Sequence, residues 1–173
     1  MKTKKTQTKR KFVSLAEARP DLVKEWNYEK NGDLKPEDVS CGSNKKVWWK
    51  LPYDVPDDYP VEHLRRKHFE FEWEAAISNR IKGRNCPFLS GKAIWKEFND
   101  LQTVNPKLAA QWHPTKNGDL KPTQFTANAV KKVWWLLSYN VPMNYPVECL
   151  RGKHFEFEWL AMIKQRNNGN DCP

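Results

Sequence analysis

The chain has 173 residues, a formal net charge of +9 and 39% hydrophobic residues. It contains no run of about 18 apolar residues, and no apolar segment follows the basic N-terminus, which argues against a membrane span and a signal peptide. The four cysteines lie far apart without a CxxC pair, unlike the disulfide framework of a small secreted domain. We therefore expect a soluble, cytoplasmic protein.

Most of the chain consists of two similar sequence repeats that are offset by 86 residues. Between 20–87 and 106–173, 38 of the 68 aligned pairs are identical and no gap is needed. Self-similarity at a fixed period is typical of a tandem array of one structural unit. The sequence predicts a basic disordered tail (1–13), a first repeat (14–89), a linker (90–101) and a second repeat (102–173).

The positive charge is concentrated in the tail. Residues 1–12 hold six Lys/Arg and no acid, whereas the remainder carries 24 basic against 21 acidic residues. Such a segment lacks the apolar periodicity of a folded element. It is either a solubilising tail or an arm that lies on the phosphates of a nucleic acid, and a block of charge does not distinguish the two.

Each repeat opens with a predicted helix and a turn. Residues 14–26 read as one short helix, with Pro20 tolerated in its first turn and Trp26 on the apolar face. The second copy offers Asn105 as an N-cap followed by Pro106. The Asn-Gly pairs within 31–36 and 117–122 indicate rigid turns that redirect the chain.

Two strand signals follow in each copy. Val47 to Trp49 is a short β signal, and the tryptophans at 48 and 49 must point to opposite faces, one into the core and the other either under the following loop or on the surface. Residues 51–64 contain three prolines and predict an irregular connection. Strict alternation over 68–77 predicts a half-buried strand that pairs back onto Val47–Trp49. The predicted fold class is α+β, with a short helix and a small antiparallel β-hairpin in each unit.

Several segments of each repeat resemble the sequences of a known family. Lys30 to Pro36, Ser43 to Trp49 and the tail from Trp73 through Arg80 and Gly83 to Cys86-Pro87 are similar to bacterial zinc-ribbon (treble-clef) tandem repeats, and the second copy repeats the pattern. The resemblance implies two tandem treble-clef-like units. Because such repeats occur as arrays and as appendages of nuclease-like proteins, it also implies association with nucleic acid as an accessory part of a nuclease or defence system.

The chain departs from that family at the metal ligands. Members place Cys after Trp-Trp-Lys and end in Cys-Pro-x-Cys, but this chain has Leu51, Leu137 and Leu89 at those positions. The ligand types that remain in the two units are His63, His68 and Cys86, and Cys149, His154 and Cys172. A structural zinc site needs four ligands, so we expect a degenerate member that binds no cofactor and folds without zinc.

The expected function is non-catalytic binding of nucleic acid, with DNA favoured over RNA through the family association. Basic groups neutralise phosphates while aromatic rings stack on bases. The candidate binding residues are Lys45, Lys46, Trp49, Arg65, Arg66, Lys67, Arg80, Lys82, Arg84, Lys131, Lys132, Trp135, Arg151, Lys153 and Arg166. The alternative is a scaffold that binds protein partners. No catalytic motif or small-molecule site is evident, so we do not expect an enzyme.

Overall fold

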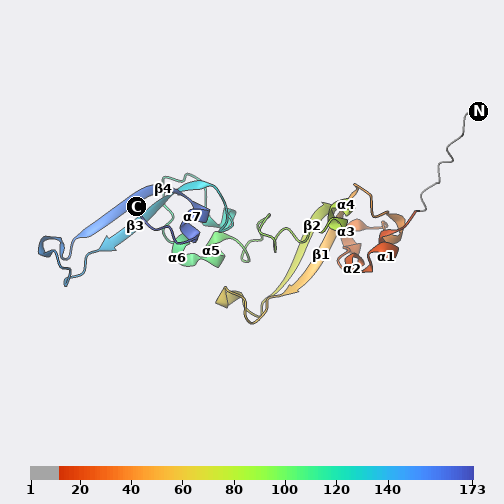
Figure 1. Ribbon diagram of the computed structural model, residues 1–173, viewed down its shortest axis with the longest axis horizontal. Helices are drawn as coiled ribbons and strands as arrows, with labels where there is room; N and C mark the ends of the chain where they lie inside the picture. Colours follow the sequence, from red (N-terminus) through yellow and green to blue (C-terminus); the bar gives the residue numbers. More distant parts are fainter. Residues whose placement is uncertain (1–11) are drawn as a thin grey trace, which may run out of the picture. The chain divides into compact units, whose positions relative to one another are not determined.

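The computed structural model describes residues 12–173, and the chain forms two compact units that divide between Cys86 and Pro87. The predicted α+β architecture is confirmed, because each unit combines short helices with one two-stranded antiparallel hairpin. In each unit the helices gather at one end of the hairpin, and a loop with a short 3-10 turn closes the other end (Figure 1). We call these the helical end and the tip.

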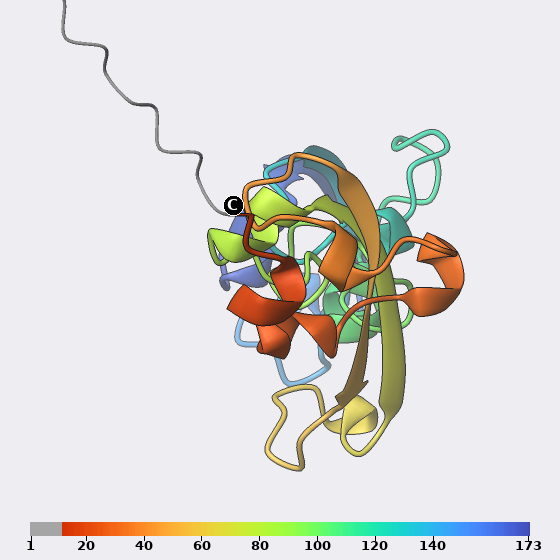
Figure 2. The same cartoon turned by 90° about the vertical axis from the view of Figure 1, so that its right-hand side faces the viewer.

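The first unit runs through eight elements, and Figure 2 shows its helices packed around one end of the hairpin. They are α1 (Leu15–Ala18), α2 (Pro20–Val23), α3 (Tyr28–Asn31), η1 (Pro36–Asp38), β1 (Lys46–Asp54), η2 (Glu62–Leu64), β2 (His68–Ala76) and α4 (Ile77–Ile81).

The second unit repeats this order without a counterpart of α3. Its elements are α5 (Leu101–Val104), α6 (Pro106–Ala109), η3 (Pro122–Gln124), β3 (Lys132–Asn140), η4 (Glu148–Leu150), β4 (His154–Met162) and α7 (Ile163–Asn167). Pro114 occupies the position of Tyr28, and the stretch that follows forms turns.

The prediction of a single helix over residues 14–26 is wrong. Two four-residue helices form instead, because Pro20 keeps the preceding Arg19 out of the helical region, at φ −143° and ψ 67°. Ser14 begins α1 with a capping box, in which its hydroxyl accepts from the Glu17 backbone and the Glu17 carboxylate accepts from the Ser14 backbone.

The first strand is longer than predicted, because residues 51–54 continue β1 and are not irregular. Pro52 lies within the strand opposite Glu70. A two-stranded sheet tolerates a proline wherever the missing N–H would point away from the partner strand. The predicted alternation of β2 is confirmed, with Phe71 and Trp73 buried and Glu70 and Glu74 exposed.

The segment expected as a linker, 90–101, lies within the second unit. Phe98 is 2% exposed and Asp100 is 1% exposed. The Asp100 carboxylate accepts from the backbone of Thr103 at 3.0 Å and so caps α5, as Ser14 caps α1. Residues 98–101 are thus the counterpart of 12–15, and they begin the second repeat.

The core of each unit is built on the inner face of its hairpin. In the second unit it comprises seven buried residues: Leu101, Leu108, Ala109, Val133, Trp135, Trp159 and Ile163. The first unit buries the equivalent Leu15, Leu22, Val47, Trp49, Trp73 and Ile77. Tryptophan supplies much of this core, since each ring buries on the order of 150–250 Å².

Candidate nucleic-acid interface

The second tryptophan of each Trp-Trp pair belongs to the core. Trp49 and Trp135 are completely buried, so the prediction that these rings stack on bases is wrong. Residues 25–27 pair beside β1, with the Asn27 N–H donating to the Trp48 carbonyl at 3.1 Å. This brings Trp26 edge-on against Trp49, with ring centroids 5.7 Å apart. The face of the ring that a base would need is therefore occupied.

Two of the predicted phosphate contacts are also buried. Arg80 and Arg166 are 3% and 6% exposed, so neither guanidinium can reach a nucleic acid. Arg80 lies between two core rings, 5.2 Å from the centroid of Trp49 and 5.3 Å from that of Trp73, and pairs with Glu25. These arginines are structural, and a sequence pattern of charge does not separate them from surface arginines.

The half-buried aromatic surface is instead provided by Trp48 and Trp134. Lys30 Nζ lies 4.3 Å from the centroid of the Trp48 ring, and Lys116 Nζ lies 4.8 Å from that of Trp134. Alternation along the strand predicted one surface tryptophan in each pair, but it did not indicate which. The stacked lysines were missed because each precedes its tryptophan by 18 residues.

A side-chain network in the first unit holds Lys30 over the ring. The Asn27 amide accepts from the Lys30 backbone at 3.0 Å and donates to Glu72 at 2.9 Å. Glu72 also forms an ion pair with Lys30 at 2.6 Å. Glu72 on β2 therefore binds both Asn27, which caps α3, and Lys30 within α3.

The second unit builds the same network with a different residue. His113, which is 5% exposed, replaces Asn27. Its Nδ1 accepts from the backbone of Lys116 at 3.1 Å, so Nε2 carries the proton that it donates to Glu158 at 2.7 Å. An imidazole in this tautomer offers one acceptor and one donor, as the Asn27 amide does.

These contacts shift the acidity of the two carboxylates. Lys30 is the main cause that lowers the pKa of Glu72 below its ordinary value, and Asn27 adds to the effect. Lys116 lowers the pKa of Glu158 most, followed by His113. Hydrogen bonds to the ionised form favour it, so both carboxylates are negatively charged at neutral pH.

The remaining candidate residues are exposed, but the hairpins separate them into two groups. At the helical end of the first unit, Lys46 pairs with Ala76 and the Lys45 carbonyl accepts from Ile77, where α4 begins and leads on to Lys82 and Arg84. At the tip lie Arg65, Arg66 and Lys67, with Arg151 and Lys153 as their counterparts. Because each strand has nine residues, about 30 Å long, the two groups do not form one site.

Much of the charge at the tip is engaged. Arg66 pairs with Asp57 at 2.7 Å, and Arg65 donates to the carbonyl of Tyr59 at 2.8 Å. Arg151 repeats the second contact with Tyr145. The tip of the first unit, residues 52–70, holds five acidic against three basic residues, which weakens its attraction for phosphates.

The helical end of the second unit carries a group of exposed lysines. Lys131, Lys132 and Lys164 lie together there, because the Ile163 N–H donates to the Lys131 carbonyl at 3.0 Å and the Lys164 N–H donates to that of Ala129 at 3.0 Å. We call these three exposed residues the lysine cluster. Within the part of the chain that the structure describes, none of them forms an ion pair.

The two units also differ in net charge. Residues 12–86 hold 13 Lys/Arg and 14 Asp/Glu, whereas residues 87–173 hold 11 and 7. The first unit is therefore close to neutral, and the second carries the excess positive charge of the folded part of the chain.

The residues present do not fit a zinc site. Among residues 12–173, no three His, Cys, Asp or Glu side chains come together as a group that holds a metal ion. His63 lies on η2 at the tip, and His68 hydrogen-bonds to Asp54 at 2.7 Å. In the second unit, Leu137 and Cys172 both pack against the core cluster. Apolar packing thus occupies the region where two of the expected ligands would lie.

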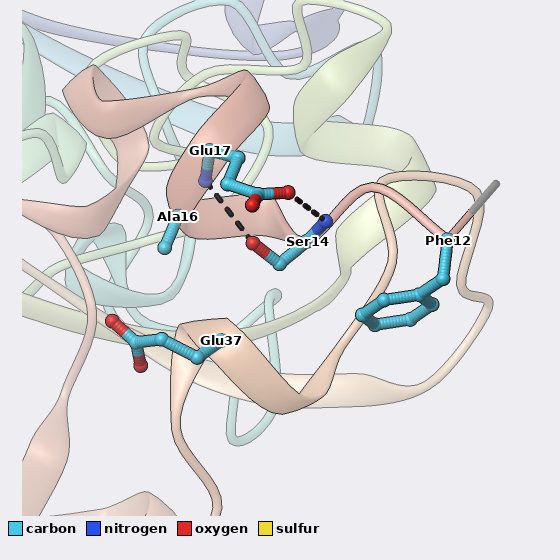
Figure 3. A pocket seen from close by; sticks show the side chains of 5 residues that line it. All are labelled: Phe12, Ser14, Ala16, Glu17 and Glu37. Atoms are coloured by element: carbon cyan, nitrogen blue, oxygen red, sulfur yellow. Dashed lines mark hydrogen bonds between the residues drawn. The ribbon is translucent and has the colours of Figure 1, made fainter.

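An open hollow on the first unit, about 420 Å³, lies beside α1. It is lined by Phe12, Ser14, Ala16, Glu17 and Glu37 (Figure 3). Ser14 and Glu17 point toward each other in the capping box, so their polar atoms are already used in beginning the helix. The hollow contributes nothing to the proposed interface.

Comparison with known proteins supports the repeat architecture. Residues 22–54 and 108–140 each match the family described as probable treble clef zinc finger domain. The two matches are offset by the repeat length and end with β1 and β3. No curated protein matches the chain. The expected resemblance to treble-clef repeats is thus confirmed for two tandem segments.

The described helices are all short. None in residues 12–173 combines the length and the apolar content that crossing a membrane requires.

Proposed function

We propose that the chain is a non-catalytic module that binds nucleic acid, DNA in preference to RNA, and that the second unit supplies most of the contacts made by the folded part. The observation that carries this proposal is the lysine cluster, three exposed cations without ion-pair partners in the described chain at one end of β3–β4. Free lysines release counterions from phosphates without reading sequence.

Trp134 adds an aromatic group to this unit. It lies on β3 two residues beyond Lys132, and Lys116 stacks on its ring. An unpaired base that displaces Lys116 would stack on this half-buried ring, and such stacking is worth about 1–3 kcal/mol per base. Weak, salt-dependent and largely sequence-independent binding is the expected behaviour.

The basic tail is the other source of affinity. Its six Lys/Arg lie within residues 1–11, outside the described residues. The tail and the lysine cluster both act through phosphate contacts, so the two contributions are distinguished by removing one at a time.

The test is binding to a DNA duplex and to a single strand over a salt series. Changing Lys131, Lys132 and Lys164 to Gln should lower the log–log salt slope by about 2–3 for three lost phosphate contacts. Changing Lys45, Lys46 and Lys82 to Gln in the nearly neutral first unit removes the same number of exposed charges, so it is the matched control and should change the slope less. Removing residues 1–11 measures the contribution of the tail.

Three outcomes contradict the proposal in different ways. Equal losses from the two sets of lysines would show that the second unit has no special role. A slope that only tail removal lowers would move the site off the repeats. The absence of binding at low salt would remove nucleic acid as the partner.

A protein-binding scaffold is the second candidate function. It is favoured by aromatic side chains exposed at the tip of the second unit, where Tyr139 is 43% and Phe157 is 42% exposed. Exposed aromatic surface rimmed by polar residues is typical of contact sites for proteins. Binding through this surface should be insensitive to salt.

A further inference from the structure

The tips of the two hairpins carry the same six apolar residues but differ in exposure. In the second unit these residues line an open hollow of about 270 Å³: Tyr139, Val141, Tyr145, Leu150, Phe155 and Phe157. The residues at the same positions of the first unit are identical: Tyr53, Val55, Tyr59, Leu64, Phe69 and Phe71. Phe71 and Leu64 are completely buried, whereas Phe157 is 42% exposed. We call the surface of the second unit the tip groove.

Four of the charged residues at the tip of the first unit are replaced by uncharged residues around the tip groove. Asn140 stands where the first unit has Asp54, Met143 and Asn144 stand in place of Asp57 and Asp58, and Gly152 stands in place of Arg66. The Asp57–Arg66 ion pair of the first unit is therefore missing. Covering the groove with another apolar surface leaves few charges to desolvate, which removes a large cost of association.

A protruding apolar side chain stands beside the groove. Met143 is 74% exposed. Its sulfur lies against Gly152, where an added Cβ would meet it at 3.2 Å. The Gly152 N–H donates at 3.0 Å to the carbonyl of Val141, which lines the groove. A flexible methionine fills irregular apolar gaps well, so a protrusion and a hollow that fit each other lie side by side on one surface.

We infer that the tip groove binds the tip of a second copy of this chain, with Met143 of each copy entering the groove of the other. A two-fold contact brings identical residues together, so its surface must be self-complementary and must not repel itself. Residues 138–156 satisfy this condition with two acidic and two basic residues. The matching part of the first unit has an excess of acids, which would oppose such a contact.

This inference gives the second candidate function its partner and is independent of nucleic-acid binding. The tip groove and the lysine cluster lie at opposite ends of the β3–β4 hairpin, since Lys132 pairs with Met162 and Asn140 pairs with His154. A change at one end can therefore be made without touching the other.

The test is sedimentation equilibrium of the full chain without nucleic acid, over roughly 1–500 µM, the range suited to a small interface. We expect a monomer–dimer equilibrium that is insensitive to salt. Met143→Asp with Asn144→Asp restores the residues of the first unit, so the backbone tolerates both, and it should weaken the dimer at least about tenfold by placing like charges across the two-fold axis.

The matched control adds the same charge elsewhere on the second unit. Asn128→Asp with Asn168→Asp changes two exposed residues at the helical end and should leave the dimer unchanged. Circular dichroism verifies that each variant is folded. A wild-type chain that stays monomeric throughout, or a dimer equally strong in both double variants, overturns the inference. Neither result affects nucleic-acid binding, which the salt series tests separately.

Discussion

Arg80 and Arg166 occupy the same buried position in the two units, but their guanidinium groups bind different side chains. Arg80 pairs with the carboxylate of Glu25, whereas Arg166 donates to the amide of Gln111. Each also donates to a backbone carbonyl four residues later, that of Arg84 or Asn170. The guanidinium therefore binds the segment before the final Cys-Pro to the core rings in both units.

Removing the guanidinium group should destabilise the first unit more than the second. Arg80→Met leaves the Glu25 carboxylate without its cation, and breaking a buried ion pair in this way costs about 3–5 kcal/mol. Arg166→Met leaves the neutral amide of Gln111 and the exposed carboxylate of Asp171, whose surface ion pair contributes little, so it should cost about 1–3 kcal/mol. Denaturant unfolding of the full chain, followed by tryptophan fluorescence, measures both. Adding Glu25→Gln to Arg80→Met should recover part of the loss, and equal losses at the two positions would contradict the argument.

The carboxylates of Glu72 and Glu158 predict how stability depends on pH. Both have a pKa lowered below the ordinary 4.5 in the folded chain. A lowered folded-state pKa contributes stability that is fully present above about pH 4.5 and is lost as the pH falls through the folded value. Neutralising the lysine partners should make this loss smaller.

The measurement is the melting temperature between about pH 7 and pH 3 for the wild type and for Lys30→Gln with Lys116→Gln. The variant should start lower and lose less on acidification. Lys35→Gln with Lys121→Gln changes two other exposed lysines at equivalent positions and serves as the control. If the two double variants respond to acid as the wild type does, the ion pairs do not govern the acid response.

At the scale of the elements, the loop that closes each hairpin has the same backbone conformation in both units but places a different residue in it. Arg66 and Gly152 both adopt positive φ, at 63° and 71°. This conformation costs an L-residue about 1–2 kcal/mol and costs glycine little. The second unit has glycine at this position, and Met143 packs against it.

Exchanging these residues should change the stability of the two units in opposite directions. Arg66→Gly should stabilise the first unit by up to about 1 kcal/mol, because the exposed ion pair with Asp57 that it loses is worth little. Gly152→Arg should destabilise the second by about 1–2 kcal/mol, since it adds the backbone strain and displaces the Met143 sulfur. Differential scanning calorimetry of the full chain measures both shifts. A destabilising Arg66→Gly would show that the surface ion pair outweighs the strain.

The asparagine of each Asn-Gly turn stabilises the first strand of its hairpin. The Asn31 side chain donates to the Trp48 carbonyl and accepts from the Trp48 N–H, both at 2.8 Å, and Asn117 does the same to Trp134. The asparagine of each Asn-Gly turn thus takes the place of a paired strand residue. The turn motif and the strand stabilise each other.

At the scale of the whole molecule, two units that share most of their residues have diverged in surface charge while keeping one core. The first unit is nearly neutral and buries Leu64 and Phe71 at its tip, whereas the second carries the excess positive charge and exposes the equivalent Phe157. Duplication followed by surface change therefore assigns both proposed contacts, with phosphates and with a second copy, mainly to the second unit.

The same comparison predicts that the fold does not depend on zinc. Leucine cannot ligate a metal, and Leu137 and Cys172 contribute to apolar packing in the second unit. Adding a chelator to the full chain should leave the melting temperature unchanged, and metal analysis should find no bound zinc. Trp159→Ala, which should cost about 3–5 kcal/mol, verifies that the assay detects a damaged core. About one tightly held zinc per unit, with unfolding on its removal, would contradict this prediction.

The sequence by itself determined the repeat, the α+β class and the hairpin partners. The repeat follows from self-similarity at an 86-residue period, and the strands and turns follow from the alternation along 68–77 and the Asn-Gly pairs. Alternation and turn residues involve only neighbouring positions, so they are visible in the sequence without any knowledge of tertiary contacts. The family match at 22–54 and 108–140 agrees with them.

Only the tertiary structure decided which of the chemically similar residues are available. Trp48 and Trp49 are neighbours in sequence, yet Trp49 is enclosed by Trp26 from a distant segment. Arg80 resembles a surface cation until Glu25 and two core rings surround it. Burial depends on contacts across 23–55 residues of chain, which no local pattern encodes. For this reason the fold was largely predictable from the sequence, whereas the burial of the candidates Trp49, Trp135, Arg80 and Arg166 was not.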